Sequence, residues 1–212
     1  NGRSEVPRDV YLRANHADQF DRIIAKPAII DGIAGIKWIS SARSNKKHGI
    51  PRASGLLILN DINTGQVYAI LDAVRISNIR TAAVSMLFLT EFRSEFRRAV
   101  IFGAGIHGRE HLRQLLVGVE RNLFPNLEEI CVYDCNLEAA KSLVVDSELP
   151  LTVLKDASSC FDLHTAVIIC TDALIPHIGL DHIIAKRGLT IVHVSLRDLT
   201  PDHADVRVEN CR

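Results

Sequence analysis

Two incompatible chemistries are encoded in the stretch AVIFGAGIHGREH, residues 99–111. Its three glycines have the G-x-G-x-x-G spacing of dinucleotide-binding turns, in which glycine lets the backbone approach a pyrophosphate. His107 and His111 have the H-x-x-E-H spacing of inverted zinc proteases. One pattern predicts a redox protein and the other a metallopeptidase, so the surrounding elements must decide between them.

The zinc motif is poorly placed for metal binding. A zinc pair at this spacing needs both histidines on one face of an established helix, whereas His107 falls inside the glycine-rich turn. No third ligand is apparent in the sequence. We therefore expect His107 and His111 to be residues of a helix start, and we expect no metal site.

The elements around the glycines are those of a dinucleotide-binding fold. Residues 99–102 predict a short strand, and residues 108–120 carry leucines at helical spacing. Asp134 ends the next predicted strand, where a carboxylate would hold ribose hydroxyls. Cys135 and Asn136 follow, with no Arg or Lys to accept a 2′-phosphate. NAD is therefore the expected cofactor rather than NADP.

Each glycine has an expected task. Gly103 permits the tight turn, Gly105 lets the backbone approach the pyrophosphate, and Gly108 lets helix and strand pack closely. The pyrophosphate is expected on the free N–H groups at the helix N-terminus. The expected cofactor-binding residues of this region are Gly103, Ala104, Gly105, Ile106, His107, Gly108 and Asp134.

Further apolar segments alternate with helical ones down the chain. LTVLK, TAVIICT and LTIVHVS predict a third, fourth and fifth strand, and NLEAAKSLVVD and GLDHIIAKR predict helices. Nearly all-apolar strands that alternate with helices indicate a parallel sheet covered on both faces. The fold class expected is α/β, with a Rossmann-type doubly wound parallel sheet.

The first part of the chain predicts a smaller α+β lobe. Residues 55–73 contain two β-rich runs around DINTG, which is typical of a hairpin with Gly65 in its turn. A helix is expected over about residues 77–95, with Ser77 as its N-cap. We therefore expect two domains: residues 1–85, a substrate-binding and dimerisation lobe, and residues 86–212, the NAD-binding domain.

Composition excludes several classes of partner. Lys plus Arg and Asp plus Glu number 25 each, so no basic surface is available to attract nucleic acid or an acidic membrane. The five cysteines are odd in number and lie mostly in apolar runs, which indicates reduced thiols and a cytoplasmic protein. No apolar run approaches the roughly 20 residues of a membrane span, and the N-terminus has no signal-peptide core.

Four motifs occur in order: a G-x-K strand with Lys37, a D-x-x-T-G hairpin at residues 61–65, an R-T-A-A helix start at Arg80, and the glycines from Gly103. With these motifs the whole chain resembles the ornithine cyclodeaminase and mu-crystallin family of NAD(P)-dependent enzymes. Members of that family are longer at both ends, and their C-terminal part returns to complete the first lobe. Because the chain also starts without Met, we expect a fragment or a truncated homologue.

The resemblance implies roles for individual residues. Lys37 and Arg13 would bind substrate carboxylates, and Asp198 would be the catalytic aspartate, with Lys37 assisting it. The contacts with substrate, cofactor phosphate or the nicotinamide pocket would come from Arg52, Arg80, Thr81 and Thr171.

The segments KWISS, GIPRAS, LILND and VSLRDLTPD are closest to one branch of the family. That branch implies NAD-dependent oxidative cleavage of N-(2-amino-2-carboxyethyl)-L-glutamate to 2,3-diaminopropionate and 2-oxoglutarate, a step toward siderophores, by a homodimer. Ile24 stands thirteen residues before Lys37, where the cyclodeaminases carry Glu, which speaks against ring closure of ornithine. The alternatives are an ornithine cyclodeaminase, a ketimine or imino-acid reductase, and a mu-crystallin-like protein that binds a nucleotide and a small ligand without turnover.

Overall fold

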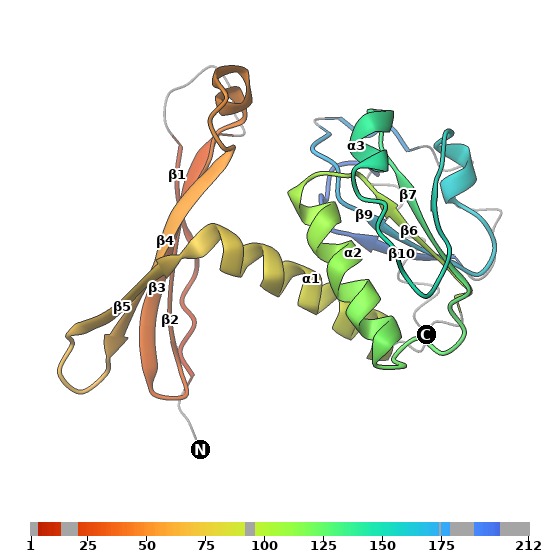
Figure 1. The fold of residues 1–212 in the computed structure, drawn as a ribbon. Helices are drawn as coiled ribbons and strands as arrows, with labels where there is room; N and C mark the ends of the chain where they lie inside the picture. The colour runs from red at the N-terminus through yellow and green to blue at the C-terminus, as the bar shows by residue number, and fades with distance from the viewer. Residues whose placement is uncertain (1–3, 14–20, 92–95, 174, 179–188, 200–212) are drawn as a thin grey trace. The chain divides into compact units, whose positions relative to one another are not determined.

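The computed structural model describes residues 4–13, 21–91, 96–173, 175–178 and 189–199. The chain divides into two compact units, residues 1–77 (unit 1) and 78–212 (unit 2) (Figure 1). The division lies within helix α1, Ala73–Glu91, and the boundary expected after residue 85 falls in the same helix. Among the described residues, no helix combines the length and apolar content needed to cross a bilayer.

Unit 1 is built on an antiparallel sheet whose five strands pair in chain order. The strands are β1 (Val10–Leu12), β2 (Arg22–Ile30), β3 (Ile33–Ser41), β4 (Ala53–Asp61) and β5 (Val67–Asp72). A 3-10 helix, η1 (Arg43–His48), connects β3 to β4. The sheet is a simple meander, because each strand pairs with the next one along the chain.

The predicted hairpin is confirmed between β4 and β5. Asp61 Oδ1 accepts from the N–H groups of Asn63 at 3.0 Å and Thr64 at 2.8 Å, which fixes the turn. These hydrogen bonds lower the pKa of the exposed Asp61 carboxyl, the contact with Thr64 contributing most. Gly65 has a φ of 72°, the left-handed conformation that its place in the turn requires.

Helix α1 begins four residues earlier than its predicted cap. Asp72 Oδ1 accepts from the N–H of Val74 at 2.8 Å, so Asp72 caps the helix. The prediction of Ser77 as N-cap is therefore wrong. Nothing between Ala73 and Ser77 breaks a helix, and an Asp immediately before this segment is as good a cap as Ser.

Unit 2 contains a parallel sheet with the strand order β10-β9-β6-β7-β8. The strands are β6 (Arg98–Phe102), β7 (Glu129–Tyr133), β8 (Leu151–Val153), β9 (Thr165–Ile169) and β10 (Thr190–His193). The helices after the first two strands are α2 (Ile106–Glu120) and α3 (Leu137–Lys141), and a 3-10 turn, η2 (Ser158–Cys160), precedes β9. The five predicted strands are confirmed, α3 is shorter than predicted, and the predicted helix at residues 179–187 lies outside the described residues.

The parallel sheet is buried on both faces, as its apolar strands predicted. One face packs against α1, α2 and α3, with Leu89, Leu115 and Ala140 in its core. The other face has a core of Val100, Phe102, Cys131, Cys160, Phe161, Val167, Ile169, Ile178 and Leu199. A sheet buried in this way holds the carboxyl ends of its strands rigidly, and ligands of doubly wound folds bind at those ends.

Candidate functional site

The glycine turn joins the carboxyl end of β6 to α2. Gly103 has a φ of 108°, which glycine adopts freely and other residues rarely do. Its N–H donates to the carbonyl of Tyr133 at 2.7 Å, and a Cβ at this position would approach the backbone of Cys170 to 3.0 Å. A side chain is therefore excluded at Gly103, and the turn is as tight as the sequence predicted.

Gly105 and Gly108 have opposite surroundings. A Cβ built on Gly108 would lie 1.9 Å from the carbonyl oxygen of Gly103, so the helix can approach the turn only with glycine here. A Cβ on Gly105 would meet no atom within 4 Å. Gly105 is the N-cap of α2, and no described side chain caps the helix there. Open backbone beside an uncapped helix N-terminus suits a phosphate group.

Asp134 follows β7 and is tied to the glycine turn. Its Oδ2 accepts from the N–H of Ala104 at 2.7 Å, and its Oδ1 accepts from the N–H of Asn136 at 2.8 Å. The half-buried carboxylate keeps lone pairs for further donors, such as the hydroxyls of a ribose. Asn136 is itself occupied as the N-cap of α3, where its side chain accepts from the N–H of Glu138 at 3.1 Å.

His111 belongs to the core of unit 2. Its Nε2 lies 2.9 Å from Ser85 Oγ, and its Nδ1 lies 2.7 Å from the carbonyl oxygen of His107. Burial lowers the pKa of His111, which favours the neutral imidazole. Glu110, the glutamate of the zinc motif, accepts from Arg113 at 2.5 Å. Both ring nitrogens of His111 are thus engaged, Nε2 with Ser85 of α1 and Nδ1 within α2 itself.

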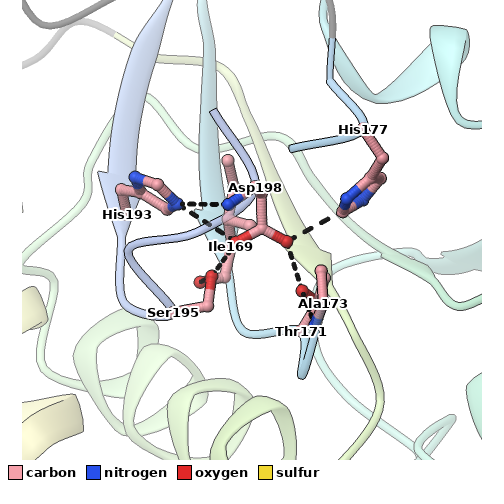
Figure 2. Close-up of polar contacts among 7 residues, drawn as sticks. All are labelled: Ile169, Thr171, Ala173, His177, His193, Ser195 and Asp198. Carbon is pink, nitrogen blue, oxygen red and sulfur yellow. Dashed lines mark hydrogen bonds and ion pairs between the residues drawn. The ribbon is translucent and has the colours of Figure 1, made fainter. Parts of the chain in front are cut away.

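Asp198 lies at the centre of a polar cluster that follows β9 and β10 (Figure 2). The hydroxyl of Thr171 donates to its Oδ1, and the hydroxyl of Ser195 donates to its Oδ2. His193 Nε2 lies 3.1 Å from Oδ2 and 3.2 Å from the backbone nitrogen of Asp198. Thr171 also adjoins the glycine turn, because its backbone nitrogen is 3.1 Å from a Cβ built on Gly103.

The Asp198 side chain is fully buried, and its charge state follows from its donors. Burial raises the pKa of this carboxyl, but the hydrogen bonds from His193, Ser195 and Thr171 outweigh burial and hold the pKa well below its usual range. The carboxylate is therefore ionised at neutral pH. Its neighbours stabilise the anion and determine how a ligand could reach it.

His177 is the solvent-facing neighbour of Asp198. Its Nε2 lies 3.8 Å from Asp198 Oδ1, and 40% of the His177 side chain is exposed while that of Asp198 is 0% exposed. Its backbone N–H donates to the Asp198 carbonyl at 3.0 Å, and its ring centroid is 6.1 Å from that of Phe102. His177 is thus fixed at the carboxyl ends of the strands, at the surface of the cluster.

The predicted cationic residues of unit 1 lie on or beside its sheet. Lys37 is half-buried on β3, and its Nζ donates to Ser77 Oγ at 3.3 Å. Arg52 precedes β4, and its Nε donates to Ser41 Oγ at 3.2 Å. Arg13 is exposed and directly follows β1.

Arg80 and Thr81 lie in the interior of α1, because the helix begins at Ala73. The expectation that R-T-A-A starts a helix is wrong for this chain, so the N-terminal N–H groups of α1 do not assist Arg80. Arg80 is exposed, and the Thr81 carbonyl accepts from Ser85 Oγ at 3.2 Å. Anion binding by Arg80 would depend on its guanidinium alone.

Several members of these clusters carry no local signal in the sequence. His193 and Ser195 sit in an apolar strand segment, His177 follows a proline, and Ser77 has the residue type of a helix cap. Their partners are distant or depend on the fold of the loop, so only the folded chain brings them together. The one usable signal is position, because His193 and Ser195 flank the end of a predicted parallel strand.

The comparisons with known proteins agree with this fold. The sequence model of the ornithine cyclodeaminase/mu-crystallin family matches residues 1–173, and the chain belongs to that family. N-((2S)-2-amino-2-carboxyethyl)-L-glutamate dehydrogenase of Staphylococcus aureus is 34% identical over 205 residues, which are 91% of this chain and 59% of that protein. Alanine dehydrogenase of Archaeoglobus fulgidus is 31% identical over 68% of this chain and 42% of its own length. The chain spans about three fifths of its first curated relatives, 59% and 62%.

Solved structures with the same fold include CmnK and an archaeal alanine dehydrogenase dimer with bound NAD. CmnK superposes with a TM-score of 0.78 at 27% identity, covering 95% of this chain and 61% of its own. The alanine dehydrogenase superposes with a TM-score of 0.71 at 25% identity, covering 86% of this chain and 54% of its own.

Proposed function

We propose that this chain is part of an NAD-dependent enzyme that oxidatively cleaves N-(2-amino-2-carboxyethyl)-L-glutamate to 2,3-diaminopropionate and 2-oxoglutarate. Its resemblance to the staphylococcal dehydrogenase supports the substrate, since that relative acts on the named compound and matches 91% of the chain. The glycine turn with Asp134 supports the cofactor. The product diaminopropionate would serve siderophore synthesis, the setting that the sequence resemblance implies.

The turn around Gly105 fits a dinucleotide. The open surface there accommodates the pyrophosphate beside the first N–H groups of α2, and the Asp134 carboxylate is held where it can accept from ribose hydroxyls. The further cofactor contacts assigned to Ala104, Ile106, His107, Thr171, Arg80 and Thr81 are part of the same proposal. NAD, when bound, takes a hydride from the substrate. The Asp134 carboxylate would repel a 2′-phosphate, so the preference is for NAD.

Unit 1 is proposed to hold the substrate by its carboxylates. Lys37, oriented by Ser77, and the exposed Arg13 supply positive charge, and Arg52 and Arg80 would add to it. Ile24 pairs with Ile39 on the same sheet face as Lys37. An aliphatic side chain thus occupies the position of the cyclodeaminase Glu. This favours simple oxidation and hydrolysis over ring closure.

In the proposed reaction the Cα–H bond of the glutamate part breaks, its electron pair leaves with the hydrogen, and the amine loses a proton. The resulting imine carbon adds water, and collapse of the adduct breaks the C–N bond to release an amine and a keto acid. Asp198 is proposed to hold the substrate amine and assist the attack of water. Because Asp198 is buried, we assign proton exchange with solvent to the exposed His177 beside it.

The observation that carries this proposal is the glycine turn at Gly103 and Gly105, to which the Asp134 carboxylate is hydrogen-bonded. A panel of the amine-linked substrate, ornithine and alanine, each with NAD or NADP, tests it through NADH or NADPH absorbance. We expect turnover of the amine-linked compound with NAD. Asp134→Ala should weaken the free energy of NAD binding by about 1–3 kcal/mol. Preferred turnover of alanine would favour an alanine dehydrogenase, as the relative from A. fulgidus suggests.

A further inference from the structure

The face of the unit 1 sheet that carries Lys37 also carries Arg22. Directly paired residues of antiparallel strands share a face, as do residues two apart along one strand. Lys37 pairs with Lys26, and four residues along β3, Ser41 pairs with Arg22. The Lys37 and Arg22 rows are therefore about 13 Å apart on one face, at about 3.3 Å per residue.

The two rows differ in what neutralises their charge. In the first row, Lys26 forms an ion pair with Asp9. In the second row, Arg22 Nε is buried and has no hydrogen-bond acceptor among the described residues. A buried guanidinium N–H that lacks an acceptor costs free energy, which an anionic ligand would recover.

A second arginine at the same end of the sheet is in the same state. Arg43 opens η1, and its backbone N–H donates at 2.9 Å to Asp21, the residue before Arg22. Its Nη1 is also buried and without an acceptor in the described part of the chain. Arg52 lies there too, bound to Ser41 Oγ opposite Arg22. Among the described residues at this end of the sheet, the one buried carboxylate is that of Asp21.

We propose that Arg22 and Arg43 bind a second carboxylate of the substrate, remote from the carboxylate at Lys37, and so select for long polycarboxylate amino acids. This inference rests on the proposed function, whose substrate carries three carboxylates. Cationic side chains in two rows about 13 Å apart on one face can hold the two ends of such a molecule. Alanine or proline has one carboxylate and can satisfy only one of the two rows.

Binding of 2-oxoglutarate and of pyruvate, measured by calorimetry, tests the inference without turnover. Arg22→Gln should weaken the binding of 2-oxoglutarate about 10- to 100-fold, because a charged hydrogen bond is lost. The affinity for pyruvate should change less than about twofold. Arg22→Lys, which keeps the charge without the planar fork, should recover part of the loss. Arg8→Gln, an exposed cation of the same unit, is the matched control and should change neither.

Equal weakening of both keto acids by Arg22→Gln, or no weakening of either, would overturn the inference. If Arg22→Gln does not fold, Arg43→Gln is expected to show the same selective loss. The proposed function fails separately. Suppose that the wild-type protein prefers 2-oxoglutarate through Arg22 but does not oxidise the amine-linked substrate. The carboxylate site at Arg22 would then stand, and the proposed reaction would be wrong.

Discussion

Asp198 combines complete burial with a negative charge, and its four polar neighbours make that combination stable. A buried carboxylate is tolerated only where donors satisfy it, and Thr171, Ser195 and His193 do so here. The same donors make it a weak base by itself. A catalytic role at Asp198 therefore depends on its neighbours, and the exposed His177 is the one that meets solvent.

Replacing Asp198 by Asn tests this residue in two ways. The new amide would place an NH₂ group against the hydroxyl of Thr171 or Ser195, which donates to the carboxylate in the wild type. We therefore expect the free energy of unfolding at pH 7 to fall by about 1–3 kcal/mol. The folded-state pKa is lowered, so the stability from ionised Asp198 is present above its unfolded pKa of about 3.9 and is lost as the pH falls below that value. Urea unfolding at pH 7 and pH 3 measures both, and the difference between wild type and variant should shrink at pH 3.

The same variant is expected to lower kcat by about 10²–10⁴-fold with little change in NAD affinity, because Asp198 and His177, proposed to assist the attack of water together, would lose the carboxylate charge. The measurement requires folded protein, so temperatures below the unfolding transition of the variant are used. A variant that is destabilised as expected but retains more than about a tenth of wild-type kcat would assign Asp198 a purely structural role.

At the scale of elements, two glycines after β6 have different roles. Gly108 is required for the packing of α2, and Gly105 is proposed to leave space for the pyrophosphate. Gly108→Ala would place a Cβ 1.9 Å from the Gly103 carbonyl oxygen, so we expect clear destabilisation although Ala favours helices. The Cβ that Gly105→Ala adds has no atom within 4 Å, and the φ of −73° at this position suits Ala. The melting temperature should therefore stay unchanged. NAD affinity should still fall about tenfold or more, because the methyl group projects into the space proposed for the pyrophosphate.

Calorimetric melting and NAD titration of both variants check this pair. Unchanged NAD affinity in Gly105→Ala would place the pyrophosphate elsewhere. Unchanged stability in Gly108→Ala would mean that α2 can shift away from the turn at little cost.

Local pattern was enough to predict the elements, but not the contacts between distant side chains. The strands of unit 2 and the turn at Gly103 follow from apolar runs and glycine spacing, which are local properties. The start of α1 was mistaken because Asp72 and Ser77 are both good caps, and pattern alone cannot choose between them. His193 joins Asp198, and Arg22 joins the Lys37 face, only through loop folding and strand register. Neither the loop fold nor the strand register is evident from the sequence, so neither of these two arrangements could be predicted from it.

At the scale of the whole molecule, unit 1 carries an exposed apolar surface, and we propose that two copies of the chain pair through it. The sheet face opposite Lys37 carries Trp38 and Leu56, which pair across β3 and β4, and Ile70 on β5. These side chains are 41%, 49% and 61% exposed. Contiguous apolar surface of this kind marks interaction sites. The related archaeal alanine dehydrogenase was solved as a dimer.

We therefore predict that Leu56→Asp converts a dimer to a monomer, because two copies would bury like charges in one interface. Sedimentation at micromolar concentration measures the change. Leu163→Asp, at an exposed apolar position of unit 2 that is 54% accessible, is the control and should stay dimeric. A wild-type protein that sediments as a monomer, or a Leu56→Asp dimer, would move the interface away from this face.

The central claim is oxidative cleavage of a secondary amine with NAD. It is tested most directly with N-(2-amino-2-carboxyethyl)-L-glutamate deuterated at the glutamate Cα, in water enriched in oxygen-18. Mass spectrometry of a single incubation should find the deuterium in NADH, the oxygen-18 in the keto group of 2-oxoglutarate, and diaminopropionate in equal amount. NADH that carries no deuterium, or NAD bound without either product being formed, would contradict the assignment.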